Sequence, residues 1–404
     1  MIYFFLVLLI IAWYALGRKN VLMKGLYGIY IIAAIASILY IFIDPDCQFF
    51  YKTKYEPLLY LLIVLVIVFD GFSGFTFNFE YLSLRKERIL KFANIISWLF
   101  IPVVLLLVYN SVRVLMNVDL TSYRQEGNFY ETGLFQGGIF LSLCVYISEL
   151  SFIPHFLFFY LLTFNGVKKS MMIRLFLASF SFAFMTLMFA GRDGIVFWLM
   201  NSVIYYSIFK DLFTVSTKKT VKRAGIIVLV LAMIPFLAIS AARFMITGSG
   251  SFSETIEPFV SYIGQGPHVF CQSFYVNQAD IEEIQRETVS AAMVESLQLY
   301  LGWTFGTFVK TLVWSFGKLG ALLVAIVLNI ISRKVINMYK KKYDIWSFFL
   351  IIMLYQIPYW GVFYYRYSIN NMEIVYGLFA IICLLMYARG RIVTKMSFDI
   401  KERA

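Results

Sequence analysis

The sequence predicts an all-α membrane protein that crosses the bilayer many times, and two observations carry this prediction. Of its 404 residues, 61% are hydrophobic and only 14% are charged, whereas soluble domains carry about 25% charged residues. The hydrophobic residues also gather in runs, most of them close to the ~20 residues that a helix needs to cross a bilayer. Both observations indicate a polytopic bundle of helices.

Eleven apolar runs follow one another, so we predict about eleven transmembrane helices in a single transmembrane domain of residues 1–404. No soluble domain or low-complexity linker separates the runs. The first run lacks a basic segment and a cleavage site, so we expect it to remain as a membrane helix. The fifth contains Pro154, which predicts one kinked or tilted helix. The runs cover residues 1–17, 25–43, 58–78, 92–109, 136–163, 171–190, 195–209, 225–242, 311–331, 346–363 and 374–388.

The placement of lysine and arginine predicts the orientation of the bundle. Alternate connections and the C-terminal tail hold 25 of the 35 basic residues, and basic residues accumulate on the cytoplasmic side of membrane proteins. We therefore expect the N-terminus outside and the C-terminus in the cytoplasm. The same asymmetry explains the net charge of +12, which therefore indicates no nucleic-acid partner.

A short polar turn joins the sixth and seventh runs: Ala190-Gly191-Arg192-Asp193-Gly194. In the predicted topology this turn lies outside, and the next helix begins at Gly194. The free N–H groups and positive dipole end of that helix then face the same space as Arg192, which outlines an anion site. The alternatives are that Arg192 pairs with Asp193 or anchors the turn among lipid headgroups.

Residues 243–310 form the longest external connection, which we predict to contribute part of the active site. Arg243 ends the eighth run and is a candidate second anion ligand; the alternative is a helix-end arginine that reaches the headgroups. Ser251 and Glu254 form an S-x-x-E start signal. The pattern predicts a short helix that breaks again near Gly264-Gln265-Gly266-Pro267.

The same connection holds the candidates for a general base. His268 follows the predicted break, and a neutral imidazole accepts a proton near pH 7; the alternative is a surface histidine with hydrogen-bonding contacts only. Glu254 and Glu257 lie three residues apart, on one face of the predicted helix, and remain candidates to accept or orient a hydroxyl. Arg124 lies in the external connection of residues 110–135 among aromatic residues, which favours substrate binding or an ordinary interfacial loop.

No pattern indicates a metal or a nucleotide. The four cysteines form no CxxC motif, and two histidines are too few for a histidine-rich metal site. There is no glycine-rich phosphate loop. We therefore predict neither metal nor cofactor. Cys47 and Cys271 are both external in the predicted topology, where a disulfide and two free thiols remain alternatives.

The eleven runs, the Gly-Arg turn between two central helices and the arginine that opens the main external loop resemble the Wzy family of O-antigen and capsular repeat-unit polymerases. Asp193 stands where members often have a small residue such as serine, so it inherits no role. The matching residues are Ala190 to Gly194, Arg243 and Tyr262-Ile263-Gly264-Gln265-Gly266-Pro267, with Arg124 where such proteins often show an arginine.

The resemblance implies a GT-C-like helical bundle with a catalytic chamber on the external face. Such enzymes transfer a growing glycan from undecaprenyl pyrophosphate to the next lipid-linked repeat unit without a metal. In this sequence it implies that Arg192 and Arg243 hold the pyrophosphate, while Gly191, Gly194 and Tyr262 help to bind substrate. Two arginines suit the charge of such a leaving group. The implied partners are the lipid-linked substrates, membrane lipids, a chain-length regulator and a flippase of the same pathway.

We therefore predict a metal-independent glycosyltransferase that polymerises O-antigen or capsule repeat units, and two rivals remain. An O-antigen ligase has a similar layout and a different acceptor. A lipid-linked oligosaccharide flippase would carry charged residues at mid-membrane depth and show two related halves. Here few ionisable residues lie away from the ends of the runs, Asp70 and Glu149 being the clearest, and no internal repeat is visible.

Overall fold

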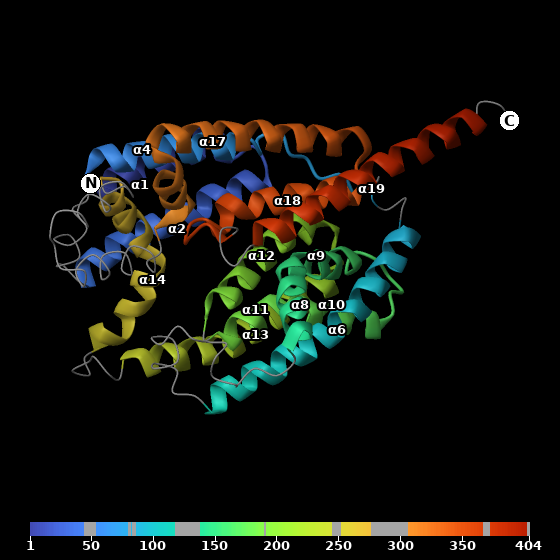
Figure 1. Ribbon diagram of the computed structural model, residues 1–404, viewed down its shortest axis with the longest axis horizontal. Coiled ribbons are helices and arrows are strands. Elements are labelled where there is room, and N and C mark those ends of the chain that lie inside the picture. The colour runs from blue at the N-terminus through green and yellow to red at the C-terminus, as the bar shows by residue number, and fades with distance from the viewer. Residues whose placement is uncertain are drawn as a thin grey trace. The chain divides into compact units, whose positions relative to one another are not determined.

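The computed structural model describes residues 1–43, 54–79, 82, 86–117, 138–189, 191–244, 252–275, 306–366 and 372–401. At residues 117, 231–244, 252–259 and 390–401 it describes the backbone only. Every element in this described part is a helix, which confirms the predicted all-α class (Figure 1).

Six described segments are long and apolar enough to cross a bilayer. The chain is therefore a multi-pass membrane protein. The segments are Val21–Ile43, Lys86–Met116, Gly138–Leu161, Lys169–Met188, Thr307–Lys342 and Met372–Arg389, with the shorter apolar helices Ile2–Gly17 and Ile345–Trp360 beside them. The count of eleven and the GT-C-like arrangement stay predictions.

The chain packs as two compact units, and the predicted single transmembrane domain stays a prediction. Unit 1 comprises Met1–Leu82 and Ile256–Ala404, and unit 2 comprises Ser83–Thr255. Unit 1 contains α1 (Ile2–Ala12), η1 (Trp13–Gly17), α2 (Val21–Ile43), α4 (Tyr55–Asp70), most of α14 (Phe252–Ser273), α17 (Thr307–Lys342), α18 (Ile345–Trp360) and α19 (Met372–Lys401). Unit 2 contains α6 (Lys86–Asn117), α8 (Gly138–Ser148), η2 (Glu149–Ser151), α9 (Phe152–Leu161), α10 (Lys169–Ser179), α11 (Ser181–Met188), α12 (Asp193–Phe209), η3 (Lys210–Leu212) and α13 (Val215–Phe244).

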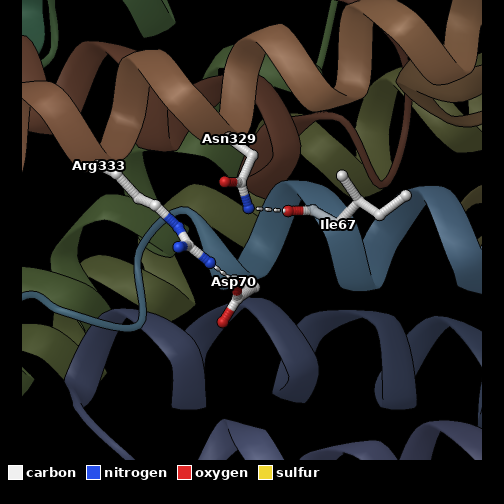
Figure 2. A network of polar contacts seen from close by, with 4 residues as sticks. All are labelled: Ile67, Asp70, Asn329 and Arg333. Carbon is white, nitrogen blue, oxygen red and sulfur yellow. Dashed lines mark hydrogen bonds and ion pairs between the residues drawn. The ribbon is translucent and has the colours of Figure 1, made fainter.

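Polar side chains join α4 to α17 inside unit 1. Asn329 donates its amide N–H to the carbonyl of Ile67 at 2.5 Å, and the guanidinium of Arg333 pairs with the carboxylate of Asp70 (Figure 2). Gly71 lies so close to α17 that a Cβ there would be 3.0 Å from the Cα of Asn329. Asp70, one of the few acidic residues within the apolar runs, thus ends a helix in an ion pair.

Contacts with other segments also explain why α4 ends at Asp70 although the apolar run continues to residue 78. After Gly71 the chain turns, and the side-chain amide of Asn20 donates to the carbonyls of Phe72 and Ser73 at 2.9 and 3.0 Å. These carbonyls have left the helical ladder and accept hydrogen bonds from another segment instead. The helix is ended by tertiary contacts, which apolar composition does not record.

Gly317 bends α17. Its φ of 68° and ψ of 175° lie in a region of backbone conformation that is essentially restricted to glycine. Figure 1 shows the first turns of α17 directed away from the long part of the helix. Thr307 and Phe308 donate their backbone N–H groups to the carbonyls of Phe363 and Gly361, so the short part is fastened to the segment after α18.

In unit 2 the fifth apolar run is one span with an interruption. The backbone leaves helical geometry at Leu150 (φ −87°, ψ 15°), within the 3₁₀ turn η2. Leu150 lies four residues before Pro154, and a proline ring clashes with the carbonyl at that position. Glu149, in the same turn, is fully buried, and η2 packs against α11.

An aromatic stack fills the interior of unit 2. The ring of Trp198 stacks on the rings of Phe180 and His155, whose centroids are 4.2 and 4.9 Å from its own. The indole N–H donates to the hydroxyl of Ser179, and Ser202 bonds the Nε2 of His155. His155 is therefore a packed and hydrogen-bonded core residue.

Candidate functional site

Thr186 holds the turn between α11 and α12 together. Its backbone carbonyl accepts the N–H groups of Phe189 and Gly191 at 3.0 and 2.7 Å. Its hydroxyl accepts the N–H of Gly194 at 3.2 Å and donates to the carbonyl of Ala183 at 3.0 Å. Thr186 thus caps both helices, because it accepts backbone N–H groups at the end of α11 and at the start of α12.

Two glycines allow this turn to be tight. A Cβ on Gly194 would be 2.3 Å from the Thr186 Oγ1 and 2.8 Å from the Cα of Ala183. A Cβ on Gly191 would be 2.9 Å from Oδ1 of Asp193 and 3.0 Å from the Thr186 carbonyl. The described structure therefore gives both glycines a packing role, and their predicted role in substrate binding stays a prediction.

Arg192 is the residue immediately before α12, and its side chain is only 8% exposed. Asp193 begins the helix, one residue earlier than predicted, and is half-buried. An ionisable group inside a membrane protein is costly and marks a candidate functional site. Unit 2 also buries Glu149, which the sequence showed only as an acidic residue away from the ends of the runs.

The other predicted anion ligands are less fully described. Arg243 is the last but one residue of α13, and its side chain lies outside the described part, as do the side chains of Glu254 and Glu257 in α14. Arg124 lies outside the described residues altogether. Nothing in the structure therefore tests a role for these four residues.

The prediction that the helix after Ser251 breaks near residues 264–267 is wrong. α14 runs without interruption from Phe252 to Ser273. Gly264 lies against α2, where a Cβ would be 2.5 Å from the carbonyl carbon of Ala36, and Ser37 donates its hydroxyl to the carbonyl of Gly264 at 2.5 Å. A neighbouring helix that approaches closely and supplies a hydroxyl allows glycine and proline to remain inside a helix.

His268 lies inside α14 and is fully buried, not on an exposed loop as the sequence predicted. Its Nε2 is 3.2 Å from the carbonyl of Ser37, and its ring meets Tyr40 edge-on. A carbonyl only accepts, so Nε2 carries the proton and Nδ1 bears the lone pair of the neutral ring. Burial holds the pKa of His268 below its ordinary value, partly opposed by the bond to Ser37. The histidine is therefore neutral at pH 7.

Tyr262 lies on the same helix as His268 and is also buried, with its ring 5.5 Å from that of Phe363. The described structure thus places the predicted site residues in two groups. Gly191, Arg192 and Gly194 belong to one turn of unit 2, whereas Tyr262 and His268 belong to the part of α14 in unit 1.

Sequence reasoning missed one buried and one half-buried basic residue in unit 1. Arg366, whose tyrosine neighbours in the sequence favour an interfacial position, is only 8% exposed. Lys310, in the first turn of α17, is half-buried and folds back over Gly306. Lys310 lies on the start of α17 and Arg366 on the segment after α18. The hydrogen bonds from Thr307 and Phe308 to residues 363 and 361 join these two segments. In the sequence, each of these residues lies next to the end of an apolar run, and this position was the only indication of its burial.

Three cysteines are free and buried: Cys144, Cys271 and Cys383. Cys271 is thus a free thiol, and Cys47, its partner in the alternative disulfide, lies outside the described residues. Burial raises the pKa of Cys271 to about 12, so the thiol is unreactive at neutral pH. Within the described residues, no three His, Cys, Asp or Glu side chains gather in a way that would hold a metal ion.

Comparison of the chain with family models, with curated proteins and with solved structures finds no match.

Proposed function

We propose that this protein polymerises oligosaccharide repeat units carried on undecaprenyl pyrophosphate, at the external face of a bacterial inner membrane. One observation carries the proposal: Arg192 is buried in a multi-pass membrane protein, at the turn that leads into α12. A guanidinium in that position suits a ligand that is both membrane-bound and anionic. The resemblance of the turn and of the external loop to Wzy polymerases supports the same substrate.

In the proposed reaction a hydroxyl oxygen of the acceptor glycan attacks the anomeric carbon of the donor glycan. The bond from that carbon to the pyrophosphate oxygen breaks, and undecaprenyl pyrophosphate leaves with the electron pair. The guanidinium of Arg192 stabilises the charge on the leaving group, with Arg243 as the second proposed ligand. A base takes the hydroxyl proton. No step requires a metal or a cofactor.

The further proposed contacts of the substrate come from the family resemblance. They involve Arg124, Gly191, Gly194, Glu254, Glu257 and Tyr262. The proposed partners are the two lipid-linked oligosaccharides and the surrounding lipids, together with a chain-length regulator and a flippase. An O-antigen ligase uses the same donor with a different acceptor, so it is the nearest rival to the proposal.

Deletion of the gene, followed by gel analysis of surface polysaccharide, tests the proposed function. Loss of a polymerase leaves a single repeat unit on the surface. Polymer retained on its lipid carrier identifies a ligase, and repeat units accumulating in the cytoplasm identify a flippase. Either of these two results contradicts the proposal.

The proposed orientation is tested with an impermeant maleimide on cells whose outer membrane is permeabilised. Replacing Cys47 by serine leaves the three buried cysteines as background. Lys54→Cys is expected to react from outside and Lys341→Cys is not, since both positions are exposed and only the second lies on the predicted cytoplasmic side. The opposite pattern reverses the topology.

His268 is the proposed base, and its role is separable from its packing. Replacement by alanine is expected to abolish polymer, whereas His268→Gln retains a donor for the Ser37 carbonyl and is expected to keep a folded protein with residual activity. Full activity of His268→Gln, together with loss in Glu254→Gln or Glu257→Gln, assigns the base to a carboxylate.

The lowered pKa of His268 also predicts a pH effect on stability. The folded protein binds this proton more weakly than the unfolded chain, so protonation favours unfolding, and stability is lost as the pH falls below about 6.5. His268→Gln is expected to lose less melting temperature than wild type between pH 7.5 and 5.5. An equal loss in both proteins removes His268 as the cause.

A further inference from the structure

Two lysine side chains of unit 1 lie over the same tyrosine ring. The ammonium nitrogen of Lys54 is 4.6 Å from the ring centroid of Tyr275. That of Lys318 is 5.5 Å from the same centroid and 4.0 Å from the centroid of Phe274. Lys54 precedes α4, the aromatic pair follows α14, and Lys318 follows the bend of α17. Three segments that are distant in the sequence thus bring two cations to one place.

Specific contacts fix this arrangement. Tyr60 donates its hydroxyl to the backbone carbonyl of Lys318, and its ring packs on Phe274 with centroids 5.2 Å apart. Tyr275 donates its hydroxyl to Oε2 of Glu56 at 3.1 Å. A carboxylate bonded to the hydroxyl increases the electron density of the ring, which strengthens the attraction for cations.

The charges of the cluster are not balanced within the described part of the chain. Two ammonium groups lie within 5.5 Å of the centroid of one ring, and like charges repel each other. The carboxylate of Glu56 is the acceptor for Tyr275, and no described carboxylate lies within 4.0 Å of Lys54 or Lys318. An anion that binds to both ammonium groups relieves this repulsion.

An apolar helix surface begins directly beside the two lysines. Leu59 and Ile63 on α4, and Leu319 and Leu323 on α17, are 46–72% exposed. α4 and α17 pack against each other and run in the same direction, from the lysines to the Asp70–Arg333 ion pair. The 16 residues of α4 span about 24 Å as a helix, close to the ~30 Å of a hydrocarbon core. The lysines therefore lie at one end of an apolar helix surface whose length suits lipid tails.

We propose that Lys54, Lys318 and Tyr275 bind the phosphate of a lipid headgroup, whose tails lie along the exposed faces of α4 and α17. Each ammonium carries three donors, enough for two lysines to share the oxygens of one phosphodiester or diphosphate. A bilayer phospholipid and a polyprenyl diphosphate present the same chemistry here. The proposal does not depend on the polymerase activity, since it concerns binding alone.

A binding titration tests the site on the purified full-length protein in detergent. The probe is a short-chain phosphatidylglycerol with a fluorescent tail, and the competitors are farnesyl diphosphate and inorganic pyrophosphate. The double variant Lys54→Gln/Lys318→Gln is expected to bind the probe about thirtyfold more weakly, because an interfacial lysine contributes roughly fivefold to headgroup binding. The double replacement by arginine is expected to retain binding. Lys334→Gln, an exposed lysine of α17 away from the cluster, is the matched control.

Each outcome of the titration bears on the proposal. Displacement of the probe by unlabelled phosphatidylglycerol or by farnesyl diphosphate supports it, and the more potent competitor identifies the preferred lipid. Unchanged affinity in a monodisperse double variant overturns it. An equal loss in Lys334→Gln also overturns it, since the effect is then general electrostatics. Pyrophosphate competing as well as the lipids removes the proposed role of the tails.

Discussion

Replacing Arg192 by alanine is expected to abolish polymer, and the single-repeat product is expected to remain. The guanidinium is the buried cation that the proposed reaction uses against the charge of the leaving pyrophosphate. Removing one preorganised donor of this kind costs about 10²–10³ in rate. Lysine supplies the charge without the planar fork of donors, so Arg192→Lys is expected to restore only part. Gel analysis of surface polysaccharide in a complemented deletion strain measures both variants.

The control for Arg192 is Arg223→Ala, because Arg223 is an exposed arginine of the same unit. It is expected to give wild-type chain lengths. Since Arg192 is buried, the amount of each variant in the membrane is measured by immunoblot, which separates lost activity from lost protein. Wild-type chain lengths in the Arg192→Ala strain remove the central claim of the proposed function.

Gly194→Ala is expected to destabilise the protein strongly. The new methyl group meets the Thr186 hydroxyl at 2.3 Å and the backbone of Ala183 at 2.8 Å. The hydroxyl must rotate, which breaks its bonds to Gly194 and Ala183, and α12 must move away from α11. Overpacking costs about 1–3 kcal/mol or more, and each lost hydrogen bond adds about 1 kcal/mol. The melting temperature of the purified protein is expected to fall clearly.

Gly225→Ala is the matched control, because no atom lies within 4 Å of a Cβ at that position in α13. There alanine only improves helix propensity, by about 0.5–1 kcal/mol, so the melting temperature is expected to stay or to rise. Equal melting temperatures for the two alanine variants would contradict the packing role of Gly194. The double variant Thr186→Ala/Gly194→Ala removes the hydroxyl clash and is expected to recover only part, since the Ala183 backbone remains.

Much of the fold was predictable because apolar composition alone decides whether a segment enters a membrane. The all-α class and the multi-pass character follow from it, and so does the polar turn at Gly191 to Gly194. The end of α4 did not follow, because Asn20 and Asn329 end that helix through contacts with residues more than fifty positions away. The division into two units also depends on such contacts.

The candidate site was predictable where chemistry and location coincide in the sequence, as at Arg192. It was not predictable for α14. A Gly-Gln-Gly-Pro segment is typical of a turn, and only the close approach of Ala36 and Ser37 keeps it helical and buries His268. The pair of lysines over Tyr275 was not predictable either, because only tertiary contacts bring the two residues together. One lies at the start of α4 and the other at the start of the long part of α17, far apart in the chain.

The bend at Gly317 divides α17 into a short part and a long part that differ in direction. A straight helix presents one continuous surface to its neighbours, whereas these two parts can contact different segments. α17 has separate anchors on either side of a joint: the carbonyls of Gly361 and Phe363 hold its first turn, and α4 holds its long part. Nothing lies within 4 Å of where a Cβ on Gly317 would be, so the positive φ, and not a lack of room, restricts this position to glycine. The bend therefore lets one helix contact two partners, the segment after α18 at its start and α4 along its long part.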